Sequence, residues 1–141
     1  MSESVFTTLP EIADRTFDKN DLAFAFLTKQ PITLGHSLIA PKRVVDKFSD
    51  LTNEERLAIL ELAERVRLKL EAVFNAKGFN YAWNEGKAYG QSVPHFHLHI
   101  VPRNEHDNGI SEYEPRQFLY RPGSREDSPE HELKATAESL R

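Results

Sequence analysis

Residues 95–101 of this chain read His-Phe-His-Leu-His-Ile-Val, so that three histidines alternate with apolar residues. A period of two is typical of a β-strand, in which successive side chains point to opposite faces. On such a strand Phe96, Leu98 and Ile100 face a core, and the three imidazoles lie in a row on the other face. An imidazole titrates near neutral pH and can act as nucleophile, base, acid or metal ligand. The histidine row therefore predicts either catalysis or metal binding.

The spacing of the row disfavours one zinc ion held by all three histidines. Alternate residues of a strand are roughly 6.6 Å apart, so the first and third are about 13 Å apart, whereas zinc holds nitrogen ligands at about 2.0–2.1 Å. The chain has no cysteine, and His36, His106 and His131 show no ligand-like spacing. Two of the three histidines with a distant ligand remain an alternative zinc site. We expect no integral metal and no required cofactor. The sequence does not indicate whether a substrate would carry magnesium.

A small polar loop precedes the row, with the sequence Tyr-Gly-Gln-Ser-Val-Pro at residues 89–94. Gly90 lets a backbone approach a ligand closely. Gln91 and Ser92 add hydrogen-bond donors beside main-chain N–H groups, which suits a phosphate. Pro94 is tolerated at the first position of a strand. The loop and the row together predict an anion cradle beside a nucleophile.

Three blocks of the chain, in the correct order between residues 15 and 105, resemble the histidine triad (HIT) superfamily. Residues 90–103 resemble its signature of alternating histidines, residues 24–43 resemble its first conserved block, and residues 83–86 resemble the segment before the signature. The resemblance is to the fragile histidine triad-like and bacterial HIT hydrolase branch. It implies an α+β HIT-like fold and a nucleotide hydrolase or nucleotidyl transferase. Such an enzyme cleaves at the α-phosphate through a nucleotidyl-histidine intermediate.

The resemblance also implies roles for individual residues. It makes His97 the nucleophile, oriented by His95 and His99, which also donate to phosphate oxygens, with His36 supporting the cluster. Crowding of like charges favours a neutral central imidazole. Thr28 stands where the family commonly places Asp or Asn against the ribose hydroxyls, and one hydroxyl replaces only one such hydrogen bond. The implied substrate-binding residues are Asn84, Gly90, Gln91, Ser92, Thr28, Phe26 and Leu38. For Phe26 and Leu38, core packing explains the sequence equally well.

Two branches of the superfamily compete as models for the substrate. Residues 29–31 and 102–103 resemble the dinucleoside polyphosphate hydrolases, which we favour, whereas residues 84–86 and 91–93 resemble the purine nucleoside phosphoramidases. A nucleotide-binding protein that works through partner contacts is a hypothesis of another class, as is a zinc-binding protein. The presence of His97 argues against a pure binder. Arg116, Arg121 and Arg125 in the tail are candidate phosphate contacts.

The length and charge of the chain limit the classes of protein that it can belong to. A chain of 141 residues predicts one domain, which we divide into a HIT domain (1–110) and a C-terminal extension (111–141) packed on or near it. The net charge of −4 argues against a nucleic-acid or anionic-membrane partner. The lack of cysteine, of a leader and of any run of ~20 apolar residues predicts a cytoplasmic protein.

The remaining elements must position the histidine row. Residues 22–27, 37–40, 79–83 and 95–101 read as strands, and a shorter C-terminal helix begins near Ser128 with Pro129 at its first position. Residues 52–77 read as a long helix, with a capping box from Thr52 to Glu55 and Gly78 at its end. Its core stripe comprises Ile59, Leu62, Ala63, Val66, Leu70 and Val73. We expect an antiparallel sheet of about five strands against this helix. By analogy with the family we expect a homodimer, for which the sequence offers only Leu57, Leu60 and Leu68 beyond the core stripe.

Overall fold

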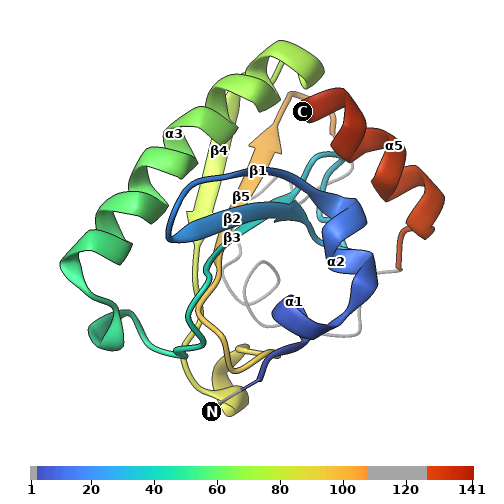
Figure 1. The fold of residues 1–141 in the computed structure, drawn as a ribbon. Helices are drawn as coiled ribbons and strands as arrows, with labels where there is room; N and C mark the ends of the chain where they lie inside the picture. The colour runs from blue at the N-terminus through green and yellow to red at the C-terminus, as the bar shows by residue number, and fades with distance from the viewer. Residues whose placement is uncertain (1–2, 108–126) are drawn as a thin grey trace.

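A five-stranded antiparallel sheet with the order β1-β2-β3-β5-β4 forms the centre of the computed structural model, which describes residues 3–107 and 127–141 (Figure 1). Every neighbouring pair of strands is antiparallel. The strands are β1 (Thr16–Lys19), β2 (Ala23–Leu27), β3 (Ser37–Pro41), β4 (Gly78–Ala82) and β5 (Leu98–Arg103). The predicted α+β fold with about five antiparallel strands is confirmed.

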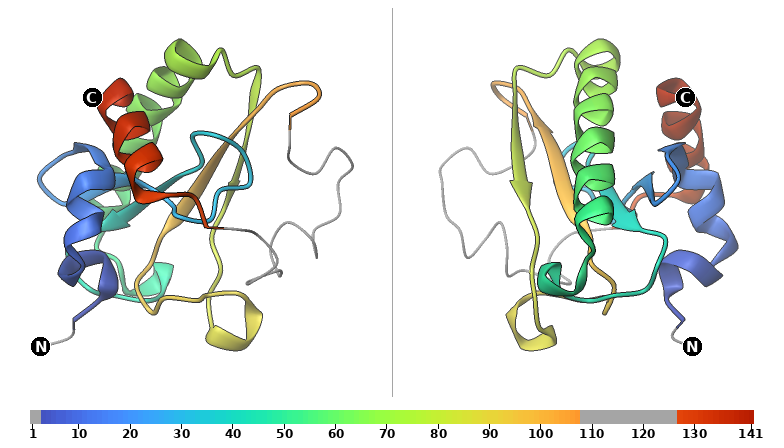
Figure 2. Two further views of the ribbon diagram at one scale, coloured as in Figure 1. Left: turned by 90° about the vertical axis from the view of Figure 1, so that its right-hand side faces the viewer. Right: turned by 60° about the vertical axis from the view of Figure 1, so that its left-hand side comes forward.

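The long helix α3 (Asn53–Phe74) runs along one face of the sheet (Figure 2). Its predicted capping box is present: Glu55 N donates to the Thr52 hydroxyl, and Thr52 N donates to the Glu55 carboxylate. The predicted end at Gly78 is wrong. Asn75 ends the helix in the left-handed conformation, which asparagine tolerates, and Gly78 instead opens β4. Val73, predicted to face the core, is 41% exposed, because the neighbouring Phe74 packs against the core at this end of the helix.

The main core lies between α3 and the sheet. Phe96, Leu98 and Ile100 are buried in it, as the alternating pattern predicts. The ladder of β5 nevertheless begins only at Leu98, three residues later than expected. Phe96 precedes it in an irregular segment, where its N–H donates to Val45 O at 2.6 Å.

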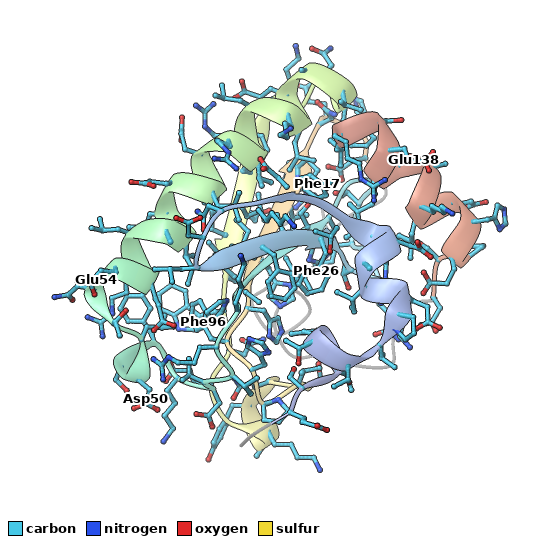
Figure 3. The ribbon with its side chains drawn as sticks, viewed as in Figure 1. Phe17, Phe26, Asp50, Glu54, Phe96 and Glu138 are labelled. Carbon is cyan, nitrogen blue, oxygen red and sulfur yellow. The ribbon has the colours of Figure 1, made fainter. Side chains whose placement is uncertain are left out.

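The opposite face of the sheet is covered by two short helices that the sequence analysis did not predict, α1 (Val5–Thr8) and α2 (Pro10–Arg15). Strand β1 was also missed. Phe26 points from β2 toward α2, and it packs with Phe6 and Ile12 of the helices and with Leu38 of β3 (Figure 3). The histidines of the row share this face.

The C-terminal helix α5 (Glu130–Leu140) lies beside α2 and β1 (Figure 2). Pro129 is its N-cap residue rather than its first helical residue, so the predicted start is one position early. Leu133, Ala137 and Leu140 are buried in the main core. The described residues also form two short 3-10 turns, η1 (Phe48–Asp50) and η2 (Lys87–Tyr89). No helix within residues 3–107 and 127–141 combines the length and apolarity needed to cross a bilayer.

Candidate active site

His97 lies directly before β5, and its ring is fixed by the backbone. Its Nδ1 is 2.8 Å from the carbonyl oxygen of His95. A carbonyl can only accept, so Nδ1 carries the proton and the lone pair of the neutral ring is on Nε2. Burial lowers the pKa of His97, and the charge of His95 is a smaller influence in the same direction. The ring is therefore neutral near pH 7, mainly because it is desolvated rather than because the imidazoles repel one another.

His36 and His99 form a second, connected pair. The N–H of Ile32 donates to His36 Nδ1 at 3.0 Å, and His36 Nε2 lies 2.9 Å from His99 Nδ1. Because a backbone N–H can only donate, His36 must hold its proton on Nε2 and give it to His99 Nδ1. His99 then carries its own proton on Nε2. The ring of His99 lies 5.1 Å from that of His97, so a nitrogen with a lone pair and a nitrogen with a proton belong to adjacent rings.

His95 has a different position from the other two histidines of the row. Its Nε2 donates to Pro41 O at 2.6 Å, and its Nδ1 is buried with no hydrogen-bond partner among the described residues. Burial lowers its pKa. In its neutral form His95 has no second N–H, so the expectation that it donates to phosphate oxygens does not fit this geometry. Its contribution to the site is the carbonyl group that orients His97.

A cavity of about 540 Å³ opens in front of His97 and His99. Of the predicted site residues, those on its wall are His97, His99, Thr28, Phe26, Leu38 and Ser92. The apolar part of the wall also includes Phe6 of α1, whose ring meets the His97 ring edge-on at 5.1 Å between centroids. The cavity thus joins an apolar surface to a pair of imidazoles.

Phe6 is a site residue that the sequence analysis missed. A single phenylalanine in a four-residue helix shows no periodicity, so no pattern singles it out. The local signals were Ser4, whose side chain accepts from Phe6 N and caps α1, and Pro10 at the first turn of α2. Both are typical helix starts.

Three of the predicted phosphate-binding residues build the loop instead of lining the cavity. Gln91 is buried, and its amide accepts from Gly86 N at 2.9 Å and donates to Asp46 O at 2.7 Å. Asn84 donates to Gly90 O at 3.4 Å. Gly90 has φ 106°, a conformation that favours glycine at the end of η2. Arg116, Arg121 and Arg125 lie outside the described residues.

No group of three or more potential metal ligands comes together in the part of the chain that the structure describes. The histidines contact one another, main-chain groups and Phe6. The site combines a buried neutral imidazole, an adjacent ring with a fixed proton, and an apolar pocket.

The chain matches the family model for the HIT domain over residues 10–106. It belongs to the HIT family. Among its relatives, a bis(5'-adenosyl)-triphosphatase of Dictyostelium discoideum is 40% identical over 91 residues, which cover 64% of this chain and 61% of that one. The nitrilase and fragile histidine triad fusion protein of Caenorhabditis elegans is 39% identical over 71% of this chain. The match spans only 23% of that fusion protein, so this HIT chain covers less than two thirds of both relatives.

Solved structures place the chain in the same family. The crystal structure of the C. elegans fusion protein superposes with a TM-score of 0.68 at 30% identity, over 90% of this chain and 27% of that one. A HIT family protein from Bacillus anthracis gives a TM-score of 0.63 at 33% identity, over 75% of this chain and 76% of that one. The HIT fold predicted from the three sequence blocks is therefore confirmed.

Proposed function

We propose that this HIT protein hydrolyses dinucleoside polyphosphates at the α-phosphate, with His97 as the nucleophile. The observation that carries the proposal is the state of His97, whose Nδ1 proton is held by the His95 carbonyl so that its lone pair is on Nε2. The ring is on the cavity wall, and its lowered pKa keeps it neutral. The triphosphatase name of the Dictyostelium relative supports the substrate class.

The reaction follows from these proton positions. Nε2 of His97 attacks the α-phosphorus, a P–N bond forms, and the P–O bond to the leaving nucleotide breaks. The ring becomes cationic, and its Nδ1–H bond to the His95 carbonyl stabilises that charge. The proton that His36 fixes on Nε2 of His99 is a donor for the negative oxygens that develop. Water then attacks phosphorus, the P–N bond breaks, and a nucleoside monophosphate leaves.

The other cavity residues contact different parts of the substrate. Phe6, Phe26 and Leu38 form the apolar wall that takes the base. Ser92, on the wall beside His97, offers its hydroxyl to a phosphate oxygen. Gln91 holds the loop that presents Ser92, because it ties Gly86 to Asp46. We propose that Asn84 and Gly90 act in the same indirect way.

A homodimer is part of the proposal. Strand β4 is an edge of the sheet, and it pairs only with β5 among the described strands. Next to this edge Tyr81 is 49% exposed, Trp83 43% and Leu60 of α3 63%. These residues line a hollow of about 340 Å³. An unpaired edge beside exposed aromatic and aliphatic groups fits a second copy of this chain, which would extend the sheet through β4.

The test compares His97→Ala with the matched surface variant His131→Ala, using a dinucleoside polyphosphate, an adenosine phosphoramidate and a nucleotide sugar as substrates. Loss of a nucleophile costs more than the about 10²–10³ of a single oxyanion donor. We expect His97→Ala to lose turnover by more than this factor, with nucleotide affinity changed far less and His131→Ala unaffected. Quenching without acid should trap a nucleotide on His97 of the wild type.

Two results would contradict the proposal. Retention of more than a few per cent of turnover by His97→Ala excludes the covalent route. Faster turnover of the phosphoramidate than of the polyphosphate keeps the nucleophile but moves the protein to the other branch, which the sequence Asn84-Glu85-Gly86 resembles.

A further inference from the structure

One end of the active-site cavity is built by the C-terminal helix. Glu130, the first residue of α5, lines the same cavity as His97 and Thr28. It lies outside the matched HIT domain, which ends at residue 106.

The turn that follows β2 anchors the segment before Glu130. Ser128 N donates to Lys29 O at 2.7 Å, and the Gln30 amide donates to the Asp127 carboxylate at 2.7 Å. The Lys29 ammonium lies 3.8 Å from the same carboxylate. Because this turn directly follows Thr28, the start of α5 is held close to Thr28 on the cavity wall.

The Arg15 guanidinium lies beside the Glu130 carboxylate. The Arg15 side chain is only 6% exposed, and its Nη1 donates to Leu27 O at 3.0 Å. Its Nε lies 3.6 Å from a carboxylate oxygen of Glu130 and has no hydrogen-bond partner among the described residues. The buried guanidinium thus places a positive charge beside the carboxylate, while 46% of the Glu130 side chain remains exposed to meet a ligand.

The charges at this end suit a neutral, hydroxyl-rich group. Glu11 and Glu130 line the cavity together with Arg15 and Lys29, so two negative charges balance two positive ones. Phosphate is better bound by His97, His99 and Ser92, which line the same cavity. A carboxylate has two oxygens that can each accept from one of two adjacent hydroxyls, whereas the single hydroxyl of Thr28 can accept only with its one oxygen.

We infer that Glu130 accepts hydrogen bonds from the 2'- and 3'-hydroxyls of a ribose bound in the cavity, with Arg15 as its positioning residue. This inference rests on the proposed function for the identity of the ligand as a nucleotide. It makes Glu130 a specificity-determining residue that selects ribonucleotides over 2'-deoxyribonucleotides. The C-terminal helix would thereby supply the hydrogen bonds that Thr28 cannot make alone.

The experiment measures kcat/KM for a ribo- and a 2'-deoxyribo-dinucleoside polyphosphate, and the affinities for the matching mononucleotides. We expect the wild type to prefer the ribonucleotides by about tenfold, since hydrogen bonds to a charged group are among the stronger ones. Glu130→Ala should remove this preference by slowing only the ribonucleotide, and Glu130→Gln should leave an intermediate preference. Arg15→Met should lower the same ratio. Glu132→Ala, on the exposed side of the same helical turn, is the matched control and should keep the wild-type ratio.

The outcomes separate the two proposals. Equal losses for both sugars in Glu130→Ala and Glu130→Gln, or an unchanged ratio, overturn the role of Glu130 while the hydrolase stands. If the protein turns over no polyphosphate, yet its affinity for the ribo-mononucleotide depends on Glu130, the proposed hydrolase activity is excluded and the proposed ribose contact is supported. Melting temperatures of all variants show whether the Ala variant is folded, and the Gln variant keeps the test valid if it is not.

Discussion

His36 Nε2 lies 2.9 Å from His99 Nδ1, although the two residues are 63 positions apart in the chain. The register of β3 on β5, in which Ser37 pairs with Ile100 and Leu38 with His99, brings them together. Since the Ile32 N–H occupies the other nitrogen of His36, the contact determines which nitrogen of His99 bears a proton. The pairing of β3 with β5 thus determines the tautomer of His99 as well as its position.

Replacing His36 should therefore impair catalysis while substrate binding is largely kept. In His36→Ala the donor to His99 Nδ1 is lost, and we expect kcat to fall by about 10²-fold, the lower range for losing a positioned proton donor, with a smaller change in KM. Nitrogen-15 NMR of the ring should show His99 losing its single tautomer. His106→Ala serves as the control, and a wild-type kcat in His36→Ala would refute the role of this pair.

Stability should fall on mild acidification. Burial lowers the pKa of His95 and of His97 below the ordinary 6.5. Below about pH 6.5 the unfolded chain therefore binds protons that the folded chain does not, so the free energy of unfolding decreases as pH falls. The stabilisation is complete above pH 6.5 and is lost toward the lowered pKa values. Urea denaturation at about pH 7.5 and about pH 5.5 measures it.

A matched variant assigns this effect to the histidines. His97→Asn removes one of the two titrating groups, so its free energy of unfolding should depend less steeply on pH in this window. Glu55, whose pKa is lowered mainly by the Arg43 guanidinium, loses its contribution only below its ordinary 4.5. An unchanged slope in His97→Asn would show that other groups cause the acid sensitivity.

Gln91 and Ser92 are adjacent in sequence, but their replacement should have different effects. Gln91→Ala leaves Gly86 N and Asp46 O without their partner, and we expect it to destabilise the fold by about 1–3 kcal/mol. Ser92→Ala should leave the melting temperature unchanged and lower kcat/KM, because Ser92 lines the cavity. Thermal unfolding and kinetics of both variants provide the comparison. If the Gln91→Ala protein keeps its full stability, the structural role of Gln91 is excluded, and direct phosphate binding becomes the explanation for this residue.

The proposed dimer can be tested at Leu60. Leu60→Glu places a charge in the hollow lined by Tyr81 and Trp83, and we expect it to shift the protein to monomer in sedimentation at micromolar concentration. Leu34, which is 67% exposed against 63% for Leu60, lies outside this hollow and provides Leu34→Glu as the control. A wild-type monomer under the same conditions would exclude the dimer.

Much of the fold could be predicted because its signals are local. The capping box from Thr52 to Glu55 and the alternation of Phe96, Leu98 and Ile100 each need only a few neighbouring residues, and both are present. Elements without such repetition were missed. Helix α1 has four residues and one buried side chain, Phe6, so its sequence carries no period.

The site was harder to predict because its roles depend on contacts distant in sequence. Nothing beside His95 indicates that its N–H bonds to Pro41 O, 54 residues away, or that Gln91 reaches Asp46 O, 45 residues away. Both are polar side chains whose partners are main-chain groups, and these have no sequence signature. The sequence alone could identify the histidines of the site, but it could not assign a role to each of them.

The wall of the cavity that carries Arg15 and Glu130 joins parts of the chain 115 residues apart. In the histidine pair, His99 lies on β5 and His36 directly precedes the neighbouring strand β3. Closing the longer loop costs more chain entropy, and the contacts that tie the start of α5 to the turn after β2 are polar and exposed. Hydrogen exchange should therefore be faster in α2 and the start of α5 than in β3 and β5, because local opening needs less energy where fewer apolar contacts are lost. Local unfolding of α2 and of the start of α5 would then widen the active-site cavity for a bulky substrate, while His97, His99 and His36 stay in place.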